Sequence, residues 1–245
     1  MRVILAIARL LIKEIFRKKD FFVVLILTGG ILFYASQLKF YNVENVVRYL
    51  MEIGLALIFF FSVILTVSLA ARQYPSEVHD RTLSVLMAKP VSRGQFILGK
   101  FLGVSLAGIS CFFIFLLLFT AITLKQSDKF SFVIFVQTGY LFCLNLILLS
   151  AMAVGLSFYL TSSANIAICV ILYFLMTIYG PSVKQVHYTL YYLLPHFEFF
   201  DLRQRLIHQW APISAGLMGF LTVYTLVYTT FFLLTGWLRF RKHLL

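Results

Sequence analysis

Residues 53–71 read IGLALIFFFSVILTVSLAA, nineteen consecutive positions without a charged side chain. About 20 helical residues cross the ~30 Å hydrocarbon core of a bilayer. Inside that core the backbone has no water to bond to, and a helix satisfies its N–H and C=O groups within one segment. We therefore interpret this stretch as a transmembrane helix.

Five other stretches are similarly apolar and uncharged. Together with the first, they give six predicted spans over residues 21–38, 53–71, 101–124, 130–160, 164–180 and 213–237. Hydrophobic residues make up 61% and charged residues 12% of the 245 positions, which leaves too few polar groups to cover a soluble domain. We expect an all-α integral membrane protein in which residues 21–245 form one six-span domain.

The basic residues lie at the ends of the apolar stretches and are distributed unevenly. Fourteen of the 21 Lys and Arg residues fall in the two terminal segments and in segment 72–100, and the other seven fall in the remaining connections. By the positive-inside rule, both termini and segment 72–100 are expected in the cytoplasm. The net charge of +12 thus indicates contact with anionic membrane lipid, and no binding of nucleic acid is expected.

Residues 1–20 combine apolar and basic positions at helical spacing. The apolar positions that would form one face are Ile4, Ile7, Ala8, Leu11, Ile12 and Ile15, and the basic residues of another face are Arg2, Arg9, Lys13 and Lys19. This pattern predicts an amphipathic helix that lies on the cytoplasmic face of the membrane.

None of the six predicted spans contains Asp, Glu, Lys, Arg or His. Ion-driven transporters place such groups at membrane depth because those groups carry the coupling ion. An intramembrane enzyme would need a carboxylate or a histidine there as well. If this protein moves a substrate uphill, we expect the energy to come from a separate subunit.

The segment between the second and third predicted spans, residues 72–100, contains a short predicted helix. Asp80 is a good N-cap, Pro90 ends the helix, and Thr82–Lys89 can form two turns between them. The residues that would share its apolar face are Leu83, Leu86 and Met87. So short a helix is not stable alone in water, so it needs lipid headgroups or a protein groove as a partner.

The same segment resembles the corresponding loop of ABC-2-type transporter permeases. The matching residues are Glu77, Thr82, Leu83, Leu86, Met87, Pro90, Val91, Ser92, Arg93 and Lys100. This chain has Arg81 where many members have Gly. The six spans, the amphipathic N-terminal stretch and the aromatic, Pro-containing stretch before the last span extend the resemblance over the whole chain.

The resemblance implies that Thr82–Lys89 is a coupling helix, which docks into a separate ATPase subunit. The residues expected at that interface are Glu77, Asp80, Arg81, Thr82, Leu83, Leu86, Met87, Lys89, Pro90 and Arg93. The resemblance also implies two permease subunits, identical or homologous, that associate with two ATPase subunits in a bacterial inner membrane, and export as the direction of transport. The 27 Phe residues fit an amphipathic or hydrophobic substrate, with Phe that faces lipid as the alternative explanation. The alternative is a non-transporting module that transmits ATPase-driven force to an extracytoplasmic protein.

No catalytic residue and no bound cofactor are expected in this chain. Gly94–Lys100 fits the first seven positions of a P-loop, but Phe101 stands where Ser or Thr has to hold Mg²⁺. ATP and Mg²⁺ are therefore expected in the partner ATPase subunit.

The segment before the last span, residues 182–212, is rich in aromatic and ionisable residues. By resemblance to the family's extracytoplasmic helices, we interpret it as a gate over the substrate path; an interfacial surface helix is the alternative. The candidate gate residues are Tyr192, Pro195, His196, Glu198 and Asp201. The spacing of His187, His196 and His208 matches no standard metal motif, so no metal site is expected.

Small and polar residues within the spans leave two interpretations open. The patterns Gly99–Gly103, Ala151–Gly155 and Ala215–Gly219 allow helices to approach closely, either within the chain or between subunits. The polar residues Gln137, Asn145 and Asn165 could face a substrate path or form hydrogen bonds between helices.

Overall fold

The computed structural model describes residues 2–15, 22–23, 26–27, 29–31, 34, 43–79, 92–123, 132–186 and 194–242. The elements in chain order are α1 (Arg2–Ile15), α3 (Val43–His79), α5 (Arg93–Thr123), α6 (Phe132–Leu156), α7 (Ser162–Val186), the 3₁₀ helix η1 (Phe197–Phe200), α9 (Arg203–Ile207) and α10 (Ala215–Lys242). All of these elements are helical, which confirms the expected all-α class for the described part of the chain.

Four of these helices are long and apolar enough to cross a membrane. Their candidate spans are Met51–His79 in α3, Arg93–Ala121 in α5, Phe132–Leu156 in α6 and Ala215–Arg241 in α10. A shorter apolar helix covers Ser162–Ile178 within α7. The first predicted span, residues 21–38, falls mostly outside the described residues. The protein is thus a multi-pass helical membrane protein.

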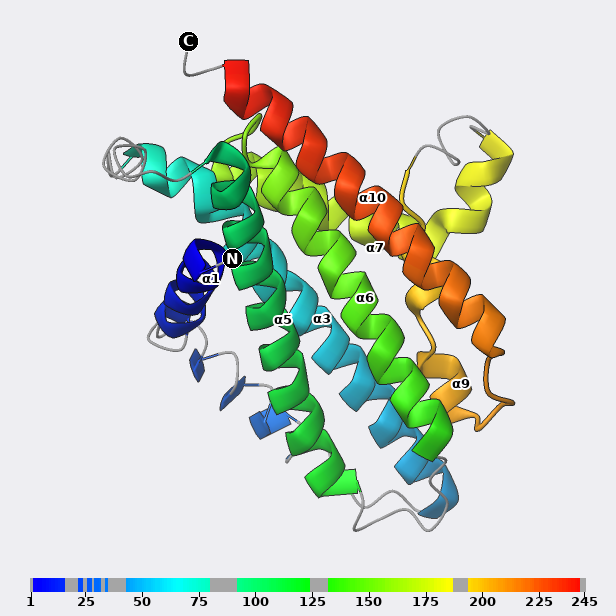
Figure 1. The fold of residues 1–245 in the computed structure, drawn as a ribbon. Helices are drawn as coiled ribbons and strands as arrows, with labels where there is room; N and C mark the ends of the chain where they lie inside the picture. Colours follow the sequence, from blue (N-terminus) through cyan, green and yellow to red (C-terminus); the bar gives the residue numbers. More distant parts are fainter. Residues whose placement is uncertain are drawn as a thin grey trace.

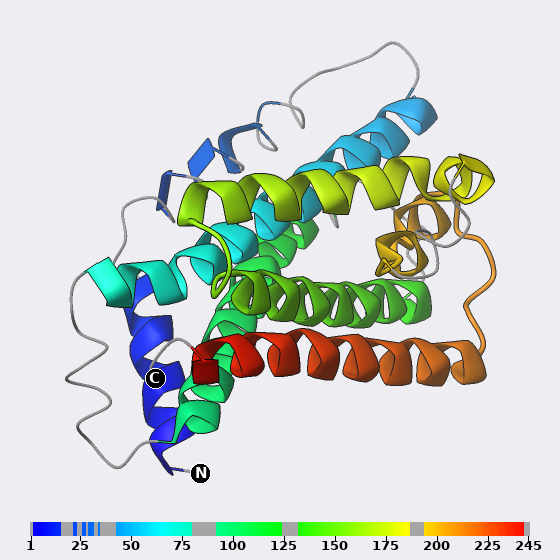
Figure 2. The same ribbon diagram turned by 90° about the horizontal axis from the view of Figure 1, so that it is seen from above.

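The helices α3, α5 and α6 run alternately up and down (Figure 1), and α7 runs antiparallel to α6 and α10 (Figure 2). The helices α3, α5 and α6 contact one another, while α7 and α10 lie on opposite sides of α6 (Figure 2). One end of the bundle holds the last turn of α3, the first turn of α5 and the last turn of α10. We name it the basic end, because Arg93, Arg239 and Arg241 lie there.

Aromatic rings fill the contact between α3, α5 and α6. The ring centroid of Phe142 on α6 lies 3.8 Å from that of Phe59 on α3 and 4.6 Å from that of Phe112 on α5. A second cluster, at the basic end, joins α3, α5 and α10 and consists of Tyr74, Phe96, Phe158 and Phe240. Because aromatic side chains bury much apolar area in defined geometries, these two clusters fix the relative positions of the long helices.

The helices α6 and α10 cross where both carry glycine. A Cβ added at Gly155 on α6 would lie 2.5 Å from the backbone oxygen of Phe232 on α10. A Cβ added at Gly236 on α10 would lie 3.2 Å from the Cα of Gly155. The pattern Ala151–Gly155 therefore serves a close contact within the chain.

The pattern Gly99–Gly103 likewise serves a contact within the chain, between α5 and α1. A Cβ added at Gly99 would lie 3.0 Å from Cβ of Ile7, and one added at Gly103 would lie 2.6 Å from Cδ1 of Leu11. The side chain of Leu11 is buried there, whereas Leu10 on the other side of α1 is 69% exposed. The apolar face of α1 is thus directed at α5.

The helices α3 and α5 extend beyond the predicted spans into the segment that connects them. The helix α3 continues past residue 71 to His79 and includes Pro75. The helix α5 begins at Arg93 rather than at residue 101. Hydropathy locates the apolar part of a helix, whereas hydrogen bonds and capping residues decide its ends.

The boundary between the fourth and fifth predicted spans also differs from the expectation. The helix α6 ends at Leu156, and residues 157–161 form a turn, so the long predicted span 130–160 is shorter as a helix. The helix α7 continues through Pro181 to Val186, beyond residue 180, where the sequence predicts the end of the span.

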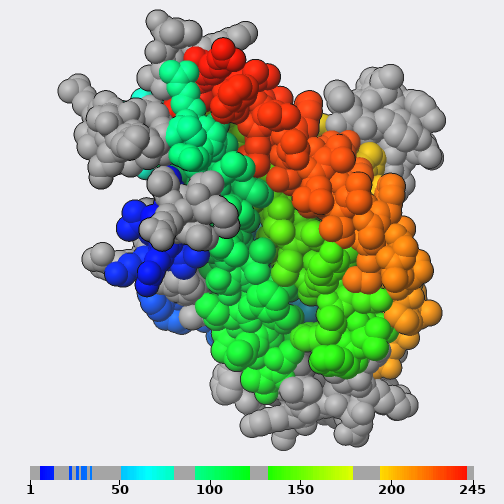
Figure 3. All heavy atoms as spheres, viewed as in Figure 1, coloured from blue at the N-terminus to red at the C-terminus, as the bar shows by residue number. Residues whose placement is uncertain are grey.

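The most exposed of the four candidate spans is α10. Only 17% of its most apolar window is buried inside the chain, against 50–56% for the other three. Figure 3 shows α10 lying along the surface of the molecule. The side chains of Phe220 and Phe231 are 61% and 53% exposed. One long face of α10 is therefore available to the surroundings of the chain in the membrane.

Candidate functional site

The predicted coupling helix lies outside the described residues. This applies to Asp80, Arg81, Thr82, Leu83, Leu86, Met87, Lys89 and Pro90, whose role at an ATPase interface stays a prediction. The structure does describe the two helix ends that this segment connects. Glu77 lies in the last turn of α3, and Arg93 begins α5.

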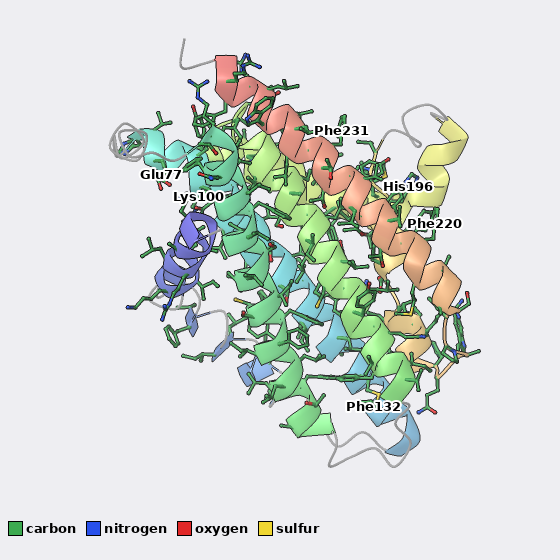
Figure 4. All side chains as sticks on the ribbon, viewed as in Figure 1. Glu77, Lys100, Phe132, His196, Phe220 and Phe231 are labelled. Atoms are coloured by element: carbon green, nitrogen blue, oxygen red, sulfur yellow. The ribbon has the colours of Figure 1, made fainter. Side chains whose placement is uncertain are left out.

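An ion pair joins these two helices at the base of the loop. The Nζ atom of Lys100 on α5 lies 2.6 Å from Oε1 of Glu77 and donates a further hydrogen bond of 3.1 Å to Oε1 of Gln73. Figure 4 shows Lys100 and Glu77 close together where α5 and α3 meet. Their side chains are only 11% and 17% exposed, so the pair is largely shielded from water. A shielded, hydrogen-bonded pair holds its geometry better than a surface pair, and this one fixes the spacing between the two ends of the loop.

The first turn of α5 is capped by its own side chains. The N–H of Gln95 donates to Oγ of Ser92 at 3.3 Å, and the N–H of Ser92 donates to Oε1 of Gln95 at 3.1 Å. This reciprocal arrangement is a capping box. Arg93 donates from Nη1 to the backbone oxygen of Arg241 at 3.2 Å, which ties the start of α5 to the end of α10. The α5 end of the loop is therefore held both by local capping and by α10.

At the opposite end of the bundle, the segment 194–213 folds over the core helices. Within it, η1 contacts α6 and α7, and α9 contacts α3 and α6. The side chains that this segment buries include Phe197, Phe200, Leu202, Leu206 and Ile207. The segment therefore covers the end of the helices that form the aromatic core.

The structure places four of the five predicted gate residues in this segment. Pro195 and His196 are buried, and Glu198 and Asp201 are half-buried, whereas Tyr192 lies outside the described residues. The backbone N–H of His196 donates to the hydroxyl of Tyr224 on α10 at 2.9 Å. The segment is thus attached to α10 as well as to α3, α6 and α7; Figure 4 shows His196 beside α10.

Asp201 holds Arg203, a residue that the sequence analysis did not single out. Nε of Arg203 lies 2.9 Å from Oδ1 and 3.0 Å from Oδ2 of Asp201, and Nη2 also donates to Oδ2. The guanidinium carbon lies 5.3 Å from the ring centroid of Phe59 on α3. Burial works to lower the pKa of Arg203, but the hydrogen bonds and the charge of Asp201 outweigh it, and the pKa stands above its ordinary value. Arg203 therefore links the gate segment to the aromatic core.

Acidification is expected to destabilise the gate segment through His196. Burial lowers the pKa of His196, and the charge of Glu198 offsets only part of that effect. The folded protein then binds the proton at a lower pH than the unfolded chain, whose histidine has a pKa of about 6.5. Stability that is present above a pH of about 6.5 is lost as the pH falls, by at most about 1.4 kcal/mol per pH unit. Thermal unfolding in detergent at neutral and mildly acidic pH measures this loss.

In the variant His196→Gln, the midpoint of thermal unfolding is expected to differ less between neutral and mildly acidic pH than it does in the unmodified protein. The exposed His208, changed to glutamine, provides the matched control and should leave the pH dependence as it is. Equal pH dependence in the unmodified protein and in His196→Gln would show that another group is responsible.

Polar side chains within the apolar helices form hydrogen bonds between elements. Asn165 on α7 donates to a backbone oxygen of α6 at 2.8 Å, and Asn145 on α6 donates to the hydroxyl of Tyr173 on α7 at 3.3 Å. Gln137 exchanges hydrogen bonds of 2.9 and 3.0 Å with the backbone of Ile213. Contacts within the chain thus account for Gln137 and Asn165 and for the Nδ2 group of Asn145, whereas Oδ1 of Asn145 is buried without a hydrogen-bond partner among the described residues. Over the described part of the chain, no three His, Cys, Asp or Glu residues gather closely enough to hold a metal ion.

Comparison with known proteins bears on the whole chain. A family model described as ABC-2 family transporter protein matches residues 6–244. This match includes every helix from α3 to α10 and the connecting segment that contains the predicted coupling helix. No curated protein matches the sequence. The chain is therefore a membrane protein of the ABC-2 transporter family.

Proposed function

We propose that this chain is the membrane-spanning permease subunit of an ATP-driven exporter, and that Thr82–Lys89 is the coupling helix for a separate ATPase subunit. The family match over residues 6–244 carries the proposal. The pair of Lys100 and Glu77 supports it, because the pair joins α5 to the last turn of α3 and so holds together the two helices that this segment connects.

A displacement of this loop would reach the opposite end of the bundle through α3. Glu77 lies in the last turn of α3, and Phe59 lies on the same helix beneath the guanidinium of Arg203. Packed interfaces tend to switch between discrete arrangements rather than deform gradually. Closure of the ATPase subunits would tilt α3 and α5 and thereby change the contact between α3 and the gate segment.

The six-span topology belongs to the same proposal. The helix α1 packs on α5 at the basic end, whereas α3 begins at the opposite end (Figure 1). A crossing by residues 21–38 would connect them and, with α3, α5, α6, α7 and α10, would make six. Both termini would then lie at the basic end, which the positive-inside rule assigns to the cytoplasm.

The assembly that we propose contains two permease subunits, identical or homologous, and two ATPase subunits in a bacterial inner membrane. ATP and Mg²⁺ would be bound by the ATPase subunits. The cargo would be amphipathic or hydrophobic, a class that the 27 Phe residues of the chain fit, with Phe that faces lipid as the alternative explanation.

A pull-down of the tagged chain from gently solubilised native membranes tests the proposal. We expect an ATPase with Walker motifs to co-purify in about equal amount, and to be lost when Leu86 and Met87 are both changed to Asp, because charge on the apolar face opposes burial in a groove. Gln204→Asp combined with Gln209→Asp, which adds two charges at exposed positions of the segment at the opposite end of the bundle, is the control and should retain the ATPase.

Absence of any ATPase from the unmodified chain in several mild detergents would contradict the coupling-helix assignment. A bound ATPase that is stimulated by an extracytoplasmic protein, without flux of any cargo, would instead support the non-transporting module.

A further inference from the structure

A groove runs between the start of α5 and the end of α10. Its volume is about 340 Å³, and its lining residues are Gly94, Ile97, Leu98, Thr230, Leu233, Leu234 and Trp237. Leu98 and Leu234 are 43% and 52% exposed, so the groove opens to the outside of the chain rather than into the bundle. Figure 3 shows the adjoining surfaces of α5 and α10 at this end of the molecule. We call it the α5–α10 groove.

The α5–α10 groove extends from the expected membrane surface into the apolar zone. Trp237 is followed along α10 by Arg239 and Arg241, and tryptophan next to basic residues is typical of the boundary between headgroups and hydrocarbon. From Trp237 to Thr230 the groove follows α10 over about 10 Å, at 1.5 Å per residue. A ligand in the groove would therefore have an apolar portion at the depth of the first part of a lipid chain.

The end of the groove that faces the membrane surface is positively charged. Arg93, adjacent to the lining residue Gly94, donates to the backbone oxygen of Arg241. The guanidinium of Arg241 lies 5.8 Å from the ring centroid of Trp237. A guanidinium has five N–H donors, so both arginines keep donors for a ligand, and no carboxylate of the described residues is paired with either. Two arginines beside an apolar groove favour a ligand with an anionic head and an apolar chain.

We propose that the α5–α10 groove binds an anionic phospholipid of the cytoplasmic leaflet. Its acyl chain would lie against Ile97, Leu98 and Leu234, and its phosphate would be bound by Arg93 and Arg241. The volume is at the low end of the ~300–1,000 Å³ range of small-molecule pockets, which suits one chain of a lipid rather than a bulky cargo. The proposal requires that the basic end faces the cytoplasm, but it does not require transport.

Native mass spectrometry of the delipidated, full-length chain tests the proposal with added phosphatidylglycerol or phosphatidylcholine. Gly94 lines the groove, and a Cβ added there meets no atom within 4 Å, so Gly94→Leu places a bulky apolar side chain at the groove without a backbone clash at its Cβ. Gly219→Leu, on α10 but outside the groove and equally free of neighbours, is the matched control. The charge is tested separately with the double variant Arg93→Gln and Arg241→Gln.

We expect the unmodified chain and Gly219→Leu to bind phosphatidylglycerol more tightly than phosphatidylcholine. Each contributing arginine should raise the affinity ratio by about fivefold. The double arginine variant should bind both lipids nearly equally, and Gly94→Leu should bind both more weakly. The proposal is overturned if the anionic preference persists in the double arginine variant, or if Gly94→Leu binds lipid as well as Gly219→Leu. Loss of a dimer in Gly94→Leu, with lipid binding unchanged, would assign the groove to a second copy of the chain instead.

Discussion

Alanine in place of Gly155 is expected to destabilise the bundle by about 1–3 kcal/mol, because the added methyl group would lie 2.5 Å from the backbone oxygen of Phe232. A backbone oxygen cannot rotate away as a flexible side chain can, so α6 and α10 would have to move apart. Gly236 approaches the same point from α10, and the separation would also loosen that contact. A larger residue such as leucine should lower the yield of folded protein further. The midpoint of thermal unfolding in detergent measures the effect.

Gly139→Ala provides the matched control on the same helix. A Cβ at Gly139 meets no atom within 4 Å, so this change adds the same methyl group without a clash. Alanine is favoured over glycine within a helix by roughly 0.5–1 kcal/mol, and Gly139→Ala should therefore be neutral or slightly stabilising. Equal unfolding midpoints for the two variants would contradict the close crossing of α6 and α10.

Methionine in place of Lys100 is expected to cost about 2–4 kcal/mol of stability, because removal of one partner of a buried ion pair costs roughly 3–5 kcal/mol and this pair keeps slight exposure. Glu77 would lose a partner at 2.6 Å, and Gln73 would lose a donor at 3.1 Å. With the base of the loop no longer held, the amount of co-purifying ATPase should fall as well. Thermal unfolding and the pull-down described above measure the two effects.

The double variant Lys100→Met with Glu77→Gln separates the charge from the packing. A neutral pair leaves no uncompensated carboxylate between α3 and α5, so we expect the double variant to recover much of the stability that the single variant loses. A double variant that is as unstable as Lys100→Met would mean that the lysine acts through packing alone.

The end of α3 shows what hydropathy does not predict. Pro75 lacks an N–H and would ordinarily end a helix near this point. In the structure, Ser76 donates from Oγ to the backbone oxygen of Arg72 at 2.6 Å, and Gln73 donates from Nε2 to that of Leu69 at 3.0 Å. The pair of Glu77 with Lys100 then holds the last turn against α5. The extension thus depends on a residue 23 positions away along the chain.

Two features of the sites were present in the sequence as short patterns. Ser92 and Gln95 have the spacing of a capping box and mark the true start of α5. Asp201 and Arg203 are close enough in sequence to pair wherever the chain turns. By contrast, nothing in the local sequence indicates that Tyr224 accepts the N–H of His196, because that contact depends on how α10 lies against the gate segment.

The sequence by itself determined that this is an α-helical membrane protein of the ABC-2 transporter family, because long uncharged stretches have no other stable conformation in lipid and the motif between two of them is specific. It also supplied the small residues at which helices approach. Only the tertiary structure decided that α1 packs against Gly103, that α10 packs against Gly155, and that Lys100 is paired with Glu77 within the chain. The physical reason is that a hydrophobicity pattern does not distinguish one apolar helix from another. Which helices pack together depends on close contact at small residues and on the few polar groups that have to be paired.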